Sequence, residues 1–447
     1  MRQILKKQPP LLPTWGNHQH NKELQAISNL LDAHPEIAAL VHRDVVGDAR
    51  DDTGRGGLSG EQVLRILLIK QIHNLSYREL AFHLDDSRAF RAFCRLGFAD
   101  GAPSSSTLQA NIKRLRPETL MEINHILVAY AREQGIEKGR TVRADCTVVE
   151  SNIHEPSDSS LLWDGVRVIT RLLGQVKSRW SSLDFYYANH NRRAKRRALN
   201  IRNASSARER RRNYRDLLKV AGWVQGYATD CLAQLGTLQG RDALALAEEL
   251  RDAVGTLAKI IDQTERRVFM GENVPASEKL VSMFEPHTDI IKKQRREIEY
   301  GHKIWLCGGK SGLISDCQVL SGNPADVTLA QDIVERQTAL YGRPPRQVAF
   351  DGGFTSSDNL AAIKQMGVQD VCFHKKRGLE VQEMVKSAWV FKRLRDFRAG
   401  IEGVISTLKR AFALDRCHWK GFTSFRAYVH SCVLAFNCIV LARHLIT

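Results

Sequence analysis

Apolar residues recur along the chain with two periods, which predict helices in some segments and strands in others. Between residues 58 and 138, and again between 156 and 289, they return every three or four positions, as on one face of a helix. Between Arg140 and Asn152 apolar and polar residues alternate, which indicates a half-buried strand. Asp145 then projects from the face opposite the apolar side chains of that strand.

Alternation returns after residue 290 and predicts an α/β fold with a mixed sheet. A hairpin of strands 304–307 and 313–320 is followed by a helix, a buried strand 347–350, a second helix and a strand 371–373. The hairpin loop Gly308-Gly-Lys-Ser-Gly312 lacks the glycine spacing of a phosphate-binding loop and leads into a strand, so we reject that interpretation. The predicted core spans 139–155 and 290–420, and an apolar helix occupies 421–447.

Three short helices are predicted at the start of the segment 58–138, beginning near Ser59, Ser76 and Ser104. They suit a helix-turn-helix that places Ser106 and Thr107 against DNA. A small bundle that only packs or dimerises has the same pattern. Residues 1–57 are predicted to be a basic arm and linker, with one helical stretch that ends at Pro35.

The formal charge of +17 and the pI near 9.6 favour a polyanionic partner, nucleic acid before an anionic membrane. No run approaches the length of a membrane span and the first residues lack a signal-peptide core, so we expect a cytoplasmic protein, associated with the nucleoid. The nine scattered cysteines predict reduced thiols, without disulfides or a zinc site.

Positive charge is concentrated in the helical segment 156–289, which we interpret as an insertion in the core. Twelve Lys or Arg against two acids lie between Arg192 and Lys219. We expect them to contact phosphates, although a solvated helical face has the same composition. The candidates are Arg192, Arg193, Lys195, Arg196, Arg197, Arg210, Arg211 and Arg212.

Three acids are the candidates for chemistry: Asp145 within the first strand, Asp351 at the end of a later strand, and Glu402 on the helix 395–416. If they converged in an α/β core they would bind Mg²⁺, which prefers oxygen ligands, and two such ions would serve phosphodiester transfer. Alone each has a simpler interpretation: a surface strand residue, a turn residue, and an i,i+4 partner of Arg398.

The chain resembles the DDE transposases of bacterial insertion sequences, and within them the ISNCY subgroup. The resemblance rests on Leu-Ser-Gly-Glu-Gln at 58–62, Val-Arg-Ala-Asp145, Phe-Asp351-Gly-Gly-Phe, and the tail motif Arg398-x3-Glu402-x6-Lys409. The family motif begins with a tyrosine, for which this chain has Arg395.

The resemblance implies an RNase H-like core that cleaves transposon ends and joins the 3′-hydroxyl to target DNA. It also implies that Asp145, Asp351 and Glu402 hold two Mg²⁺ ions, for which Mn²⁺ substitutes, and that Arg398, Lys409 and the Arg395 position contact DNA. A homodimer or larger complex on double-stranded DNA is expected. The alternatives are a nuclease without strand transfer and a DNA-binding protein without catalysis. Glu285-Pro-His287-Thr-Asp289 is either near the site or a local turn.

Overall fold

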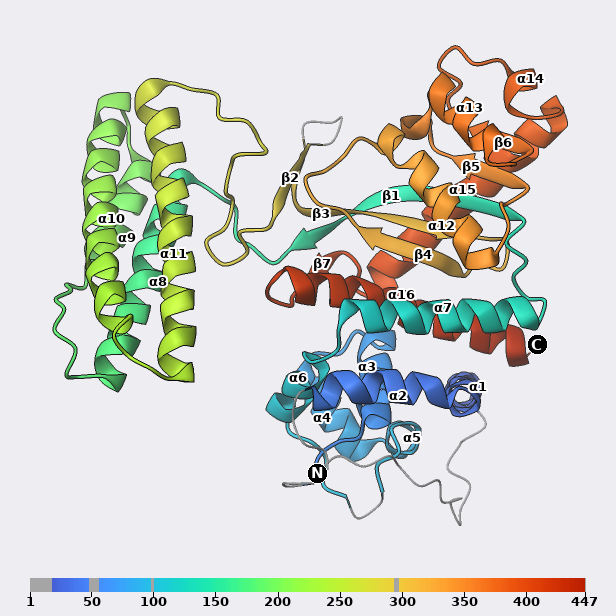
Figure 1. Cartoon of the computed structure of the whole chain (residues 1–447), viewed down its shortest axis with the longest axis horizontal. Helices are drawn as coiled ribbons and strands as arrows, with labels where there is room; N and C mark the ends of the chain where they lie inside the picture. Colours follow the sequence, from blue (N-terminus) through green and yellow to red (C-terminus); the bar gives the residue numbers. More distant parts are fainter. Residues whose placement is uncertain (1–17, 48–55, 98–99, 293–296, 447) are drawn as a thin grey trace. The chain divides into compact units, whose positions relative to one another are not determined.

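In the computed structural model, residues 18–47, 56–97, 100–292 and 297–446 are described. They divide into two compact units, one made of the described residues up to Glu150 and from His302 onward, the other of Ser151–Gly301. The chain leaves the first unit within strand β1 and returns to it within strand β3 (Figure 1).

The sheet contains seven strands among the described residues, and its main path runs β2-β3-β1-β5-β6. β1 pairs in parallel with β5, and β5 with β6, whereas β3 is antiparallel to β2 and β4. The mixed sheet expected from the alternation is therefore confirmed. The strands are β1 Thr141–Ser151, β2 Asp289–Lys292, β3 Ile298–Gly308, β4 Ile314–Val319, β5 Gln347–Phe350, β6 Asp370–Phe373 and β7 Arg416–Cys417.

Helices α12 to α15 belong to the sheet region, and their apolar residues share one core with β1, β5 and β6. The crossover from β5 to β6 is made by helix α13, whereas the connection from β1 to β5 passes through the second unit and strands β2 to β4 before α12 leads into β5. These helices are α12 Ala330–Tyr341, α13 Ser357–Gln365, α14 Val381–Met384 and α15 Ala388–Ala411, with short 3₁₀ turns η2 Asp326–Thr328 and η3 Gly352–Phe354.

The amino-terminal helices form a second core around α3, α7 and α16. Two helices precede residue 58, where we expected an arm. The predicted helical stretch is confirmed as α1, which ends at Ala33 just before Pro35, and Pro35 then begins a second helix, α2, where the missing N–H of proline costs nothing. Residues 1–17 and 48–55 of the expected arm and linker lie outside the described residues. The helices are α1 Gln19–Ala33, α2 Pro35–Val46, α3 Gly60–Ile72, α4 Tyr77–Asp86, α5 Arg88–Phe93, α6 Ser105–Ile112 and α7 Pro117–Glu133.

The carboxy-terminal helix α16 (Phe422–Ile446) packs along α7, α1 and α3 (Figure 1). It is long and apolar enough to cross a membrane, yet 72% of its most apolar window is buried inside the protein. Such burial is typical of a core helix, so its composition is weak evidence for a membrane span.

The second unit is a bundle of four helices, α8 to α11, which run side by side in Figure 1. Each buries an apolar stripe in a common core that includes Leu173, Leu217 and Leu257. The bundle helices are α8 Asp158–Arg179, α9 Asn191–Asn203, α10 Ala207–Leu235 and α11 Arg241–Glu265, followed by a π-helical turn, η1 Arg266–Met270.

Candidate active site

Asp145 and Asp351 lie beside each other because their strands pair in parallel. Ala144 of β1 is opposite Phe350 of β5 in the register, so the next residue on each strand is an aspartate. The chain turns immediately after Asp351, which occupies the position before the 3₁₀ turn η3. The structure therefore brings together two acids that are far apart in the sequence.

The two glycines after Asp351 are required by close packing. A Cβ atom on Gly352 would lie 2.7 Å from Cβ of Lys375, and one on Gly353 would lie 2.5 Å from a carboxylate oxygen of Asp326. Asp326 is held in turn by Lys303 Nζ at 2.9 Å. Lys303, Lys375 and Asp326 surround the Asp351 turn and were not among our candidates, because no local motif marks them.

Helix α15 lies close to β1 at Gly400. A Cβ atom there would lie 2.0 Å from a guanidinium nitrogen of Arg143, which donates a hydrogen bond to the carbonyl of Phe397 at 2.7 Å. Arg143 and Asp145 are two residues apart on β1 and therefore project from the same face of the sheet. The absence of a Cβ atom at Gly400 leaves room for the Arg143 guanidinium group, whose hydrogen bond to Phe397 joins α15 to β1 near Asp145.

Arg398 of α15 contacts all three candidate acids. Its Nη2 atom lies 3.0 Å from Asp145 Oδ2 and 3.5 Å from Asp351 Oδ1. Its Nη1 atom lies 2.8 Å from Glu402 Oε1, one helical turn further along. The i,i+4 pair expected as the simpler interpretation of Glu402 is present, but the same guanidinium group also holds the two aspartates.

Burial distinguishes the three acids. The side chain of Asp145 is 16% exposed and that of Glu402 is 60% exposed. Burial raises the pKa of Asp145 to about 6, with a further rise from the charge of Asp351, although Arg398 opposes it. Burial lowers the pKa of Arg398, but the nearby carboxylates outweigh it and raise that pKa above its ordinary value.

The three carboxylates are the kind of ligand that a hard divalent cation prefers, since each offers oxygen atoms. They already converge on one positive group, and exposed Glu402 has room to reorient. Within 18–47, 56–97, 100–292 and 297–446, however, no three Asp, Glu, His or Cys side chains are close enough in this arrangement to hold a metal ion. Arg398 takes the position between the acids, so a metal there requires its guanidinium group to move.

A cleft of about 600 Å³ opens beside Asp145 and Glu402. Lys409 and Arg410 line it from the last turn of α15, and Asp415 lies 3.9 Å from Lys409 Nζ. Lys409 was a sequence candidate; Arg410 was not, although it is the adjacent cation. Arg395, by contrast, does not line this cleft, and its Nε atom lies 3.8 Å from Asp396.

Ser106 and Thr107 are exposed at the start of α6. Both hydroxyl groups lie 2.9 Å from the hydroxyl of Ser104, the residue that caps this helix. α6 packs on α3 and α4, as a helix-turn-helix would place it. Their contact with DNA stays a prediction.

The basic residues of α9 and α10 fall into two groups. Arg193 and Arg197 both donate to Asp216 and lower its pKa to about 2. They therefore help to join the two helices. The others of our candidates are exposed: Arg192, Lys195, Arg196, Arg210, Arg211 and Arg212.

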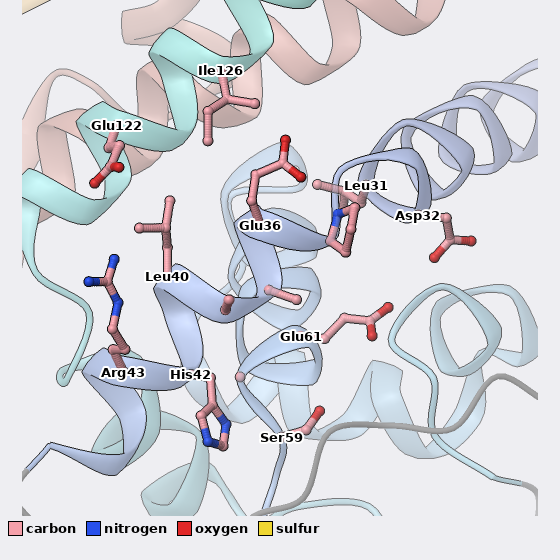
Figure 2. Close-up of a pocket in the computed structure, with 14 residues that line it drawn as sticks. Leu31, Asp32, Glu36, Leu40, His42, Arg43, Ser59, Glu61, Glu122 and Ile126 are labelled. Atoms are coloured by element: carbon pink, nitrogen blue, oxygen red, sulfur yellow. The ribbon is translucent and has the colours of Figure 1, made fainter.

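Two other features do not involve the three acids. A mainly apolar pocket of about 620 Å³ lies among α1, α2, α3 and α7, lined by Leu31, Leu40 and Ile126 with acids at its edge (Figure 2). In the second unit, His287 Nε2 lies 2.8 Å from Glu285 Oε2, and Thr288 N donates to the carbonyl of Glu285, so this segment contains a local turn.

Comparison with protein families gives two matches. A family described as Transposase domain (DUF772) matches residues 16–114, and one described as Transposase DDE domain matches residues 286–438. The second range contains Asp351 and Glu402, whereas Asp145 lies in neither range. No curated protein and no solved structure matches the chain. The first match begins near α1, in agreement with the two helices found before residue 58.

Proposed function

Since the chain belongs to the DDE transposases of insertion sequences, with their RNase H-like core, we propose that it cleaves the ends of its element and joins them to target DNA. The observation that carries this proposal is the convergence of Asp145, Asp351 and Glu402 on Arg398. Enzymes of this family generally use divalent metal ions. The chain's charge of +17 supports a polyanionic substrate.

In the proposed reaction a water molecule attacks a phosphodiester, the P–O3′ bond breaks, and the departing 3′ oxygen takes up a proton. The freed 3′-hydroxyl then attacks a target phosphodiester, forms a new P–O bond and displaces a second 3′ oxygen. Two Mg²⁺ ions, when bound, would activate the attacking oxygen and stabilise the departing one. Asp145, Asp351 and Glu402 would hold them, and Mn²⁺ would serve in their place.

The cations of α15 would position the phosphate groups of the DNA and offset their charge. Lys409 and Arg410 line the cleft beside Asp145 and would hold phosphate groups there. Once the three acids hold metal ions, Arg398 would be released from them and would offset the negative charge that develops on the phosphate. Because two ends must be held together for joining, we propose a homodimer or larger assembly on DNA.

The test is a cleavage and joining assay with DNA that carries the element's own ends. The purified protein should cut these ends in Mg²⁺ or Mn²⁺, should not cut them in excess chelator, and should join the cut strand to a second duplex. Cutting without joining would favour the nuclease alternative, and end binding without either reaction would favour the regulator.

The exposed cations of α9 should contribute to DNA binding. Arg192, Lys195 and Arg196 lie three and four residues apart and share one helical face. Replacing all three by glutamine should weaken duplex binding and reduce the slope of log K against log salt by about 0.9 for each phosphate that is no longer neutralised. Fluorescence anisotropy over a salt series measures both quantities.

A matched control removes the same number of charges from the same bundle. Arg241, Arg251 and Lys259 are exposed on α11, and their replacement by glutamine should leave the salt slope unchanged. An equal change in both triple variants would show that α9 is only a solvated face.

A further inference from the structure

A pocket of about 520 Å³ lies at the junction of α3, α4 and α6 with the segment between β7 and α16. Its lining carries three lysines, Lys70, Lys113 and Lys420, and the aromatic residues Tyr77 and Trp419. The volume falls within the range of ligand sites in proteins, roughly 300–1,000 Å³. We refer to this cavity as the Lys70 pocket.

Lys70 has an unusual position for a lysine, because only 8% of the residue is exposed. Its ammonium group lies 5.1 Å from the centre of the Tyr77 ring. No hydrogen bond or ion pair to Lys70 Nζ is found in the described part of the chain. Burial lowers the pKa of Lys70, which reflects the cost of holding a charge there without a counter-ion.

One acid, Glu79, is among the lining residues; its charge favours the charged form of Lys70, but the two form no ion pair among the described residues. The carboxylate of Glu79 accepts a hydrogen bond from the backbone N–H of Ser76 at 2.7 Å and so caps α4. Lys113 and Lys420 are exposed at the rim. With three lysines against one acid the lining is positive on balance, and Trp419 offers an aromatic surface, a combination that suits a phosphate attached to a nucleoside.

The face of α6 that we expect to meet DNA continues into this pocket. Gln109 and Lys113 both line it, and they follow Ser106 by three and seven residues, so the three share one face. We propose that the Lys70 pocket binds a backbone phosphate of the DNA that α6 contacts, with the attached nucleoside against Trp419. This proposal rests on the proposed function in its choice of DNA as ligand.

The test is Lys70→Met in the full-length protein, with Lys22→Met as control because Lys22 lies on α1 and does not line the pocket. Binding of a mixed-sequence duplex is measured over a salt series in chelator. Lys70→Met should weaken binding and lower the salt slope by about 0.9, the value for one phosphate, and Lys22→Met should not. The free Lys70→Met protein should melt at or above the wild-type temperature, because an unpaired buried charge is removed.

A structural role for Lys70 gives a different result: a lower melting temperature with an unchanged salt slope would overturn the proposal.

The double variant Lys113→Met, Lys420→Met changes only exposed residues and should lower the slope as well, which keeps the test valid if Lys70→Met fails to fold. Calorimetry with deoxyadenosine 5′-monophosphate separates a second source of phosphate. Loss of its binding in Lys70→Met with an unchanged duplex slope would assign the pocket to a free nucleotide. Since no step needs cleavage, an inactive wild type would refute the proposed function and not this pocket.

Discussion

Asp145→Asn should reduce the rate of metal-dependent end cleavage by about a thousandfold or more. The amide keeps the size of the side chain but removes the charge that would hold a divalent cation, and such a cation supplies several kcal/mol of transition-state stabilisation. Asp145 is the most buried of the three acids and shares the guanidinium group of Arg398 with Asp351. Single-turnover cleavage of duplexes with the element's ends gives the rate.

Asp351→Asn should have an effect of similar size, because the two aspartates are neighbours on paired strands. The control is Asp396→Asn, which changes an exposed acid of α15 that does not line the cleft. Cleavage by Asp145→Asn at the rate of the control would show that the catalytic site lies elsewhere.

Arg398→Gln should make the protein less stable in chelator and more responsive to Mg²⁺. Without the guanidinium group the acids lose their shared positive partner, and loss of one partner of a buried ion pair costs about 3–5 kcal/mol. In wild type, Mg²⁺ would have to compete with Arg398 for the oxygens of the three acids. Thermal unfolding with and without Mg²⁺ measures both effects, and the Mg²⁺-induced rise in melting temperature should be larger in the variant.

Arg132→Gln serves as the control, since Arg132 is exposed on α7. An equal Mg²⁺-induced shift in Arg398→Gln and wild type would mean that Arg398 does not compete with the metal. Loss of stability without any Mg²⁺ response would assign the three acids to a structural ion-pair cluster.

Sequence patterns predicted the sheet and the helices capped by Ser59, Ser76 and Ser104, but they missed α2 in the segment before residue 58. Alternation identified the strand of Asp145, and the buried run before Asp351 identified its neighbour, because period two is a direct consequence of strand geometry. The helix that ends before Pro35 was predicted, but the second helix that begins at Pro35 was not, since proline both ends helices and begins them. Only the packing of α2 against α3 distinguishes these two roles.

The contacts of the candidate site depend on packing that no local pattern encodes. The tail motif indicated the spacing of Arg398, Glu402 and Lys409 on one helix. It did not predict that Arg398 reaches Asp145, because that contact depends on how closely α15 approaches β1 at Gly400. The Lys70 pocket could not be predicted from the sequence for the same reason, because its lining residues come from distant parts of the chain.

The chain leaves the first unit within β1 and returns to it within β3, and this path affects how the protein folds during translation. β1 leaves the ribosome well before its partners β3 and β5, and the four helices in between can fold first from contacts that are local in sequence. The entropic cost of closing so long a loop grows only with the logarithm of its length, so the long segment between β1 and β3 lowers the stability of the folded protein only slightly. Until α15 is synthesised, however, the nascent chain lacks Arg398 and Glu402, so the cluster of three acids around Arg398 cannot form.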